Sequence, residues 1–295
     1  MTRIAFATFA GAPEIADDDR LAVDAFSARG VDVIGVPWDG PDALPDALQE
    51  ADVSGLVLRS CWNYHRAPER FHAWLDALER ANVPVVNATS LARWNLSKVY
   101  FRDLAARSVA VPTSVFVPPG DPRSLRDVIE EAALDEVVVK PWISMNGWDT
   151  WRSSRTLAAS HEAAWRALVA TRGMLVQRYL REIEQGGELS FVFFGGVFSH
   201  ALRKVPRAGE FRVQVEYGGA RLSLRPSASL IEQARAILEA APCATTYGRV
   251  DGVEVDGRLH LMELEVLDPT LFFEIDPWAA ERFAEAVVHG LLTPG

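Results

Sequence analysis

Three carboxylates lie within one apolar stretch near the end of the sequence, RVDGVEVDGRLHLMELEVLDPT, residues 249–270. Asp251 lies in a run typical of a strand, and Glu263 and Glu265 lie two apart in the run that follows a VDG turn. Because side chains alternate along a strand, we expect both glutamates on one face. An isolated ion in apolar surroundings is costly, so this face needs a cation.

Two kinds of cation are compatible with this face. Arg249 and Arg258 belong to the same predicted hairpin and could form salt bridges with the acids. Clustered oxygen ligands without cysteine or histidine also suit Mg²⁺ or Mn²⁺, which bind through a few carboxylates together with substrate phosphates. The metal interpretation predicts that phosphate-binding residues are found elsewhere in the chain.

Four basic residues meet that expectation: Lys98 on a predicted helix, Lys140 in VVVKP, Lys204 on a second predicted hairpin and Arg212 in GEFRVQ. A lysine is usually a solvated surface residue, so each of them alone says little. Lys140 is the most informative of the four, because it stands at the exit of a strand that reads as buried.

The turn of the acidic hairpin decides which carboxylates share a face. With a two-residue loop, 256–257, Asp251 would lie opposite Met262 and on the other face from the two glutamates. With a three-residue loop, 255–257, Asp251 lies opposite Leu261 and all three carboxylates share one face. We predict the three-residue loop, or an equivalent bulge, with the three carboxylates converging on one or two metal ions.

Length and composition limit the class of protein. The chain has 295 residues, of which 49% are hydrophobic and 24% charged, so it is long enough for several subdomains. Its net charge of −10 argues against a nucleic-acid partner. Cys61 and Cys243 give neither a disulfide framework nor a metal-ligand spacing, and no apolar run has the length of a signal peptide or membrane span. We expect a cytoplasmic protein with no membrane partner, and we allow for a homodimer.

The elements that position these residues fall into three segments, 1–90, 91–172 and 173–295. In the first segment strands alternate with helices, which is typical of a doubly wound parallel sheet. Ligands of such sheets bind beyond the carboxyl ends of the strands, where LRSCWNYHR follows the third strand. This stretch is either a polar loop with anchoring aromatics or a substrate site, in which Arg59 would bind a carboxylate beside Ser60. The predicted strands are 4–9, 31–38, 54–60 and 83–87, and the predicted helices are 17–29 and 71–81.

The later segments mix helices and strands in an α+β pattern. The second contains the helix LARWNLSKVYFRDLAARS, the strand-like VAVPTSVFV, the helix SLRDVIEEAAL and the strand EVVVK, followed by the polar loop WISMNGWDTWRS. The third contains the strand MLVQRYL and the hairpin LSFVFFGGVFSHALRKV, in which Gly195 and Gly196 suit a tight turn. A helix over 229–240, the acidic hairpin and a helix over 277–291 complete it.

Taken together, these motifs resemble the ATP-grasp ligases. The order of a lysine, a strand-ending Lys-Pro with a polar loop, QRYL, GGE, GEFR and Asp…Glu-x-Glu is similar to bacterial glutathione synthetase and, more closely, to the cyclo-ligase type of D-cycloserine formation. The resemblance covers nearly the whole chain. It implies an α/β ATP-grasp fold, with a substrate-binding amino-terminal domain over 1–90 and two α+β lobes, 91–172 and 173–295, that sandwich ATP.

The resemblance also implies a set of nucleotide-binding residues. Lys98 and Lys140 would hold phosphates, and QRYL would be the hinge whose backbone binds adenine. Glu188 would bind ribose, with Glu184 as the alternative. The full implied set for ATP is Lys98, Lys140, Gln177, Tyr179, Leu180, Glu184, Glu188 and Lys204.

The implied chemistry uses the remaining polar residues. Arg212 would stabilise an acyl phosphate and, with Lys140, is assigned to catalysis. Asp251, Glu263 and Glu265 would bind Mg²⁺ or Mn²⁺. The implied substrate residues are Arg59, Ser60, Asn146, Trp148 and Arg212.

This sequence departs from the family pattern in two places. Glu265 stands where many relatives have asparagine, which adds a charge to the metal set. The loop SMNGWDTW has one glycine where relatives are Gly-rich, so it is predicted to present side chains such as those of Met145, Asn146, Trp148 and Trp151 and to narrow substrate choice.

The implied function is an ATP-dependent carboxylate–amine ligase that acts through an acyl phosphate on a small amino-acid-like substrate. Ring closure, as in D-cycloserine formation, is a sub-hypothesis. The alternatives are phosphotransfer without amide formation and a non-catalytic nucleotide-binding regulator. A regulator need not keep all the lysines and carboxylates, which argues against the last alternative.

Overall fold

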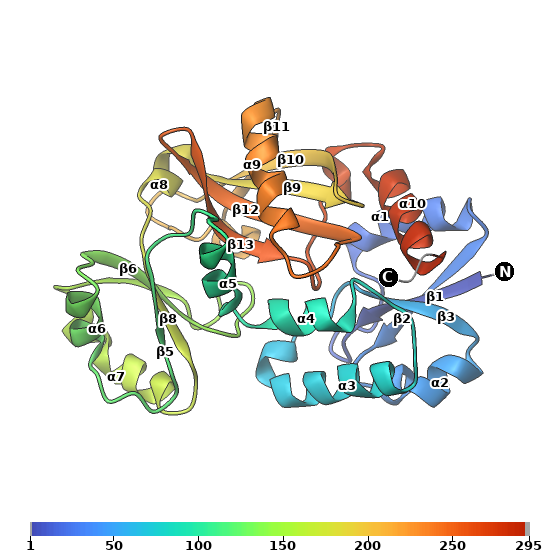
Figure 1. The fold of residues 1–295 in the computed structure, drawn as a ribbon, viewed down its shortest axis with the longest axis horizontal. Helices are drawn as coiled ribbons and strands as arrows, with labels where there is room; N and C mark the ends of the chain where they lie inside the picture. The colour runs from blue at the N-terminus through green and yellow to red at the C-terminus, as the bar shows by residue number, and fades with distance from the viewer. Residues whose placement is uncertain (1, 293–295) are drawn as a thin grey trace.

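The computed structural model describes residues 2–292, which form three sheets with helices packed on them (Figure 1). Residue 1 and residues 293–295, which the predicted first and third segments include, lie outside the described residues. Within residues 2–292, no helix combines the length and the apolar character that crossing a bilayer requires.

The first domain is the predicted doubly wound parallel sheet, with strand order β2-β1-β3-β4. Side chains of β1 alternate between the two faces of the sheet, and both faces are buried. Ile4 and Phe6 pack in the same core cluster as α1, whereas Ala5 and Ala7 pack in the cluster of α2 and α3. Its elements are β1 (Thr2–Thr8), α1 (Asp17–Ser27), β2 (Val31–Pro37), α2 (Pro45–Glu50), β3 (Val53–Leu58), α3 (Pro68–Arg80) and β4 (Val85–Val86), with short 3₁₀ turns η1 (Pro41–Ala43) and η2 (Tyr64–Arg66).

The last helix, α10 (Ala279–Leu292), returns to this first domain and lies beside α1 (Figure 1). Phe283 meets Phe26 of α1 edge to face at 5.7 Å between ring centroids, and it meets Phe6 of β1 at 6.3 Å. A helix that the sequence order places in the third segment therefore completes the core of the first.

The central lobe is an antiparallel sheet, order β5-β8-β6-β7, covered by two helices. The first helix begins at a capping box, in which Ser124 accepts from the Asp127 amide and Asp127 accepts from the Ser124 amide. Its sheet extends beyond residue 172, because the strand that includes Gln177 pairs with two other strands of the lobe. The elements are β5 (Ser114–Val117), α6 (Leu125–Glu131), β6 (Glu136–Pro141), β7 (Trp151–Ser154), α7 (Ala158–Val169) and β8 (Met174–Arg178).

The segment around Lys98, predicted as one helix, is two helices: α4 (Thr89–Leu96) and α5 (Tyr100–Ala106). Ser97 is extended, with φ −110° and ψ 128°, and the Lys98 amide donates to the Trp142 carbonyl at 2.7 Å. The break ties the Lys98 backbone to the residue that follows β6. It therefore fixes Lys98 close to the end of the strand that contains Lys140.

The C-terminal lobe is a five-stranded antiparallel sheet, order β11-β10-β9-β12-β13. The predicted tight turn joins β9 to β10, with positive φ at Gly195 (55°) and Gly196 (76°). The elements are α8 (Glu182–Gly186), β9 (Glu188–Phe194), β10 (Val197–Val205), η3 (Val215–Tyr217), β11 (Ala220–Leu224), α9 (Ala228–Glu239), β12 (Tyr247–Val255), β13 (Arg258–Glu265) and η4 (Phe273–Ile275).

The acidic hairpin uses a two-residue loop together with a bulge. Asp256 and Gly257 have φ values of 50° and 78°, the signs that a tight two-residue turn requires, so the predicted three-residue loop is wrong. The predicted equivalent bulge is present, because the register shifts beside Asp251 and leaves Met262 as the extra residue. Asp251 consequently pairs with Glu263, and the carboxylates share one face.

Candidate active site

A cavity of about 650 Å³ lies where the three parts of the molecule meet. The central lobe contributes Val138 and Lys140 to its wall, the C-terminal lobe contributes Asp251 and the rest of the acidic hairpin, and the first domain contributes Trp62 and Tyr64. The aromatic part of the LRSCWNYHR stretch and the acidic hairpin therefore face one cavity.

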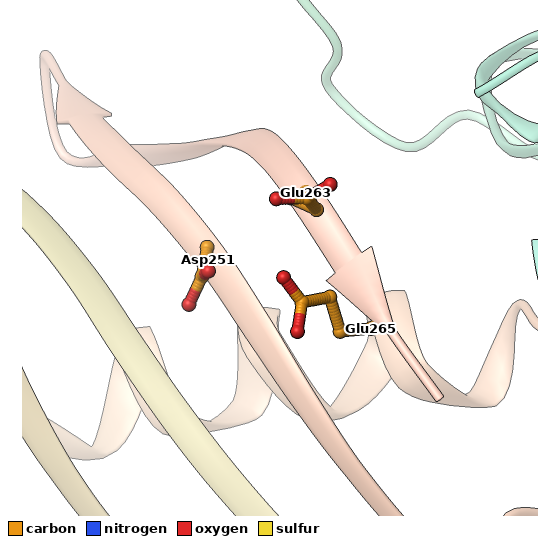
Figure 2. A group of neighbouring side chains, drawn as sticks. All are labelled: Asp251, Glu263 and Glu265. Carbon is orange, nitrogen blue, oxygen red and sulfur yellow. The ribbon is translucent and has the colours of Figure 1, made fainter. Parts of the chain in front are cut away.

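The three carboxylates of the hairpin converge on this cavity. Oxygens of Asp251, Glu263 and Glu265 all lie within 4.8 Å of one another. Figure 2 shows the carboxylate of Glu265 directed from β13 toward Asp251 on β12. The bulge is the local cause, because it brings the glutamates onto the cavity side while Leu261 and Leu264 remain in the core.

Three cations hold the acidic group in place. Arg249 donates to Asp251 (3.0 Å) and pairs with Glu265 (2.7 Å), Lys204 contacts Asp251 (3.0 Å), and Lys98 contacts Glu263 (3.1 Å). The salt-bridge alternative is therefore correct for Arg249, whereas Arg258 is exposed next to the turn. Ion pairing and metal binding are compatible here, because the cations leave part of the glutamates open to the cavity.

The pKa values of the acids differ according to their partners. Burial would raise the pKa of Asp251, but the charges of Arg249 and Lys204 outweigh it and lower that pKa to about 2. Burial raises the pKa of Glu265 to about 8, against the charge of Arg249 and with a further contribution from Glu263. Glu265 is therefore the carboxylate that gains most from an additional cation.

The donor chemistry of this group fits a hard divalent cation. Glu263 and Glu265 keep 32% and 28% of their side chains exposed, whereas Asp251 keeps 2%. Both oxygens of Asp251 already accept hydrogen bonds, including one of 2.6 Å from Ser190. A Mg²⁺ or Mn²⁺ ion would thus be held first by the two glutamates, with Asp251 anchoring the group.

Lys140 faces the same cavity without an anionic partner among residues 2–292. Its residue is 9% exposed, and its ammonium lies 5.7 Å above the Phe101 ring. Burial first, and then the neighbouring charge of Lys98, lower the pKa of Lys140 to about 8. Lys98 differs, because it donates to the Ser144 carbonyl at 3.0 Å as well as contacting Glu263. An unpaired buried ammonium is well suited to receive a phosphate oxygen.

An apolar slot extends from these lysines toward the predicted hinge. Gln177, Tyr179 and Leu180 all line the cavity, and the Gln177 amide donates to Ser114 at 3.0 Å. The slot lies between β6 of the central lobe and β13 of the C-terminal lobe, which is the arrangement that a flat base requires. Its apolar walls are Val138, Leu180, Ile183, Phe211, Val213 and Met262.

The two ribose candidates differ in position. Glu188 lines the cavity and contacts Lys204 at 3.1 Å, and burial raises its pKa. Glu184 lies outside the cavity wall, where its carboxylate accepts from the Tyr179 hydroxyl and from Arg152, both at 2.8 Å. The geometry therefore favours Glu188 over Glu184.

Two loops close over the cavity, the 142–150 loop and the 206–219 loop. The Tyr217 hydroxyl contacts the Asn146 carbonyl at 3.3 Å, and both Asn146 and Arg212 line the cavity. Arg212 lies 3.6 Å over the Tyr217 ring and pairs with Glu210 at 2.7 Å. The loops thus bring Arg212 to the wall of the cavity that Lys98 and Lys140 also line.

Trp148, which was predicted for the substrate site, does not line the cavity. Its ring lies 4.9 Å from that of His65 in the first domain, and the guanidinium of Arg172 lies 4.3 Å above it. Arg172 also pairs with Asp149 at 2.7 Å. Trp148 therefore holds the 142–150 loop against the first domain.

Arg59 and Ser60 also fall outside the cavity wall, so the structure does not bring the predicted carboxylate-binding arginine to the cavity. The Arg59 side chain is 1% exposed, and it donates to Asp19 (2.7 Å) and to the Pro269 carbonyl (2.8 Å). Ser60 is 2% exposed and contacts the same aspartate. The partner, Asp19, lies on α1, far from Arg59 in the sequence. The LRSCWNYHR stretch alone therefore could not reveal this ion pair.

The sequence prediction missed several residues of the cavity wall, and Asp268 is the most informative of them. Asp268 lines the wall, is 8% exposed and lies three residues beyond Glu265. Burial, followed by the charge of Glu265, raises the pKa of Asp268 well above its ordinary value. An acidic residue directly after an apolar strand and before a proline is the signal that would have found it.

Comparisons with known proteins agree with this geometry. Residues 4–87 match the family model of the D-cycloserine synthetase DcsG N-terminal domain, and residues 108–279 match that of the prokaryotic glutathione synthetase ATP-grasp domain. The chain is 31% identical over 277 residues to the cycloserine biosynthesis protein DcsG of Streptomyces lavendulae, covering 88% of this chain and 90% of that one. It is 30% identical over 251 residues to the glutathione synthetase of Bordetella parapertussis, covering 83% and 74%.

Solved structures give the same result. The crystal structure of D-cycloserine synthetase DcsG superimposes with a TM-score of 0.85 at 25% identity, covering 98% of this chain and 99% of that one. The D-alanine–D-alanine ligase from Bacillus anthracis complexed with ATP has a TM-score of 0.69 at 14% identity, covering 99% and 98%, which is a likeness of fold.

Fold and site together define an ATP-grasp ligase, a class of enzymes that use ATP and divalent metal ions, and the predicted fold and enzyme class are confirmed. The chain belongs to the prokaryotic glutathione synthetase family of ATP-grasp enzymes and has an amino-terminal domain of the D-cycloserine synthetase type.

Proposed function

We propose that this enzyme joins a carboxylate to an amine on a small amino-acid-like substrate, through an acyl phosphate made with ATP. The observation that carries the proposal is the unpaired buried ammonium of Lys140, which shares one cavity with the acidic hairpin and an apolar slot. No cysteine or histidine of residues 2–292 lines that cavity, so neither of the commonest nucleophile and proton-transfer groups is at hand. Phosphoryl transfer needs mainly positioning and charge neutralisation, which these residues supply.

The residues divide the work between the two ends of ATP. The apolar slot next to QRYL takes adenine, and Glu188 is placed for ribose. Lys98 and Lys140 hold the phosphates, and a divalent cation bound by Glu263 and Glu265 would neutralise phosphate charge during transfer.

Two substitutions occur in sequence, and each forms one bond and breaks another. A substrate carboxylate oxygen attacks the γ-phosphorus and ADP leaves; an amine nitrogen then attacks the carbonyl carbon, phosphate leaves and one proton is released. Arg212 is placed to stabilise the negative charge of the acyl phosphate and of the tetrahedral centre. The 142–150 and 206–219 loops cover the cavity and protect the acyl phosphate from water.

Ring closure within one molecule is the finer form of this proposal. It is supported by the likeness to a cycloserine biosynthesis protein over nearly the full length of both chains, since D-cycloserine is a cyclic molecule. The amine and the carboxylate would then belong to one small substrate.

The experiment is a screen of amino acids for stimulated release of ADP and phosphate, with mass spectrometry of the products. We expect stoichiometric ADP and phosphate together with a product lighter than the substrates by one water. ADP release with a phosphorylated product and no free phosphate would favour phosphotransfer, and tight ATP binding without turnover across the screen would favour a regulator.

A further inference from the structure

Asp268 lies at the first-domain end of the cavity. It follows β13 by three residues, and the segment after it is tied to the first turn of α1, because Asp18 accepts from the amides of Leu271 and Phe273 at 2.9 Å each. Tyr64 of the first domain lines the same cavity. Asp268 therefore lies where the acidic hairpin leads into the segment that contacts the first domain.

The carboxylate of Asp268 is buried and lacks a protein partner on one side. Its Oδ2 atom is buried and accepts no hydrogen bond from residues 2–292. The other buried aspartates of the described chain, Asp19 and Asp251, are each held by an arginine, at 2.7 Å and 3.0 Å. A buried carboxylate without a donor is costly, so a ligand that supplies one is strongly favoured at this position.

Acids line the first-domain part of the cavity wall, where Asp268 lies with Glu14 of the β1–α1 loop and Asp18 of α1, beside Arg20. Lys98 and Lys204 line the wall together with the acids that they pair with, and Lys140 lines it unpaired. A substrate with a carboxylate and an amine would place the carboxylate toward the lysines, next to the γ-phosphate, and its nitrogen toward the acids.

A structural role is the main rival explanation. Arg59 lies nearby, and its Nη1 atom is buried without a partner, so Asp268 could serve as a second countercharge for that arginine. Arg59 directs its other nitrogens to Asp19 and Pro269 instead, and it donates to neither oxygen of Asp268. The two explanations predict opposite effects on stability.

We propose that Asp268 binds the nitrogen of the substrate, accepting a hydrogen bond from its ammonium or N–H group. This inference rests on the proposed ligase function and specifies the chemistry of its substrate: a small molecule with a free amine, oriented with that amine toward Asp268. It makes Asp268 a specificity-determining residue of the ligation site.

The test compares Asp268→Asn with a matched control, Asp256→Asn, which removes an exposed acid from the turn of the same hairpin. The probes are glycine, D-alanine and D-serine, each beside its N-acetylated form. ADP release is followed with MgATP, ATP affinity is measured by calorimetry, and melting temperature is measured without ligands.

We expect wild type and Asp256→Asn to respond to the free amines and not to the acetylated forms. Asp268→Asn should raise KM for the amine about tenfold or more, with ATP affinity unchanged. Its melting temperature should be unchanged or higher, because an unpaired buried carboxylate is removed.

Two results would overturn the inference: an unchanged KM in Asp268→Asn, or a melting temperature several degrees lower, which would assign Asp268 to Arg59. Equal responses of wild type to free and acetylated probes would also contradict it. If no probe stimulated ADP release, the proposed ligase activity would be in question, and the melting temperature would still decide between the two roles of Asp268.

Discussion

Residues 2–292 contain two buried arginine–aspartate pairs, and one of the two lines the cavity of the candidate active site. Arg59 and Asp19 are 1% and 3% exposed and lie outside the cavity wall, whereas Arg249 and Asp251 are 7% and 2% exposed and form part of it. Burial keeps the pKa of Asp19 above its ordinary value in spite of Arg59.

The difference lies in what surrounds each pair. Arg59 lies 5.3 Å from the Tyr247 ring and 5.3 Å from the Phe283 ring, so its neighbours are core aromatics. Arg249 instead reaches Glu265, whose carboxylate remains partly open to the cavity. In this protein, the buried arginine at the candidate ligand site contacts two acids, and one of them remains accessible from the cavity. The buried arginine in the core contacts one acid, and that acid is enclosed.

The largest effect expected from this comparison is on stability. Arg59→Ala leaves Asp19 buried without a partner, which should lower the free energy of unfolding by about 3–5 kcal/mol. Urea denaturation checks this, with Arg258→Ala as the exposed control. Because Arg59 does not line the cavity, the folded fraction should keep its KM for ATP and acceptor; a stable variant with a raised KM for substrate would restore the discarded substrate role.

Arg249→Gln should sharpen the contrast, because its defect depends on metal. Without divalent ions Asp251 and Glu265 lose the cation that they share, and we expect the free energy of unfolding to fall by about 2–4 kcal/mol. Mg²⁺ should restore part of this loss, since a cation held by Glu263 and Glu265 replaces the missing charge. Melting curves with EDTA and with Mg²⁺ measure the effect. If Mg²⁺ restored the stability of Arg59→Ala to the same extent, the distinction between the core pair and the cavity pair would be contradicted.

Lys140 provides a pH test of the same site. Its pKa of about 8 in the free enzyme means that the ammonium is lost above that pH, whereas bound phosphate requires it to be charged. Affinity for MgATP should therefore be level below about pH 8 and fall by about tenfold per pH unit above it. Calorimetry across this range should show no such fall in Lys140→Arg, whose guanidinium stays charged. A flat wild-type profile would be inconsistent with an unpaired buried lysine.

The smallest expected effect concerns the contact between the 142–150 loop and the first domain. Trp148→Ala removes packing against His65 and Arg172 but no cavity contact, so KM for the acceptor should rise about threefold to tenfold while stability changes little. Trp278→Ala, which removes a tryptophan that is 67% exposed and lies off the cavity, is the matched control. An effect as large as that of losing a substrate-binding residue would return Trp148 to the substrate site.

The sequence predicted much of the fold, because strand alternation and turns are determined by residues only a few positions apart in the chain. The parallel sheet, the hairpin turn at Gly195 and the convergence of Asp251 with the glutamates all follow from it. The break at Ser97 was not predictable in this way, since no proline or glycine marks it and its cause is a hydrogen bond to Trp142.

Tertiary partners account for the remaining errors. Arg59 could not be assigned from its own stretch because its partner lies on α1, and Asp268 stands out only when its missing partner is known. The need to align the carboxylates predicted a three-residue loop or an equivalent bulge, but it could not choose between them or place the bulge at Met262, because either combination satisfies that need.

The most direct test of the account is turnover by Lys140→Ala with the acceptor found in the screen. If Lys140 is the unpaired ammonium that receives a phosphate, the variant should fold with an unchanged or higher melting temperature and release ADP at least about a hundredfold more slowly. ADP release close to that of wild type by the folded variant would contradict the assignment of this cavity as the nucleotide site.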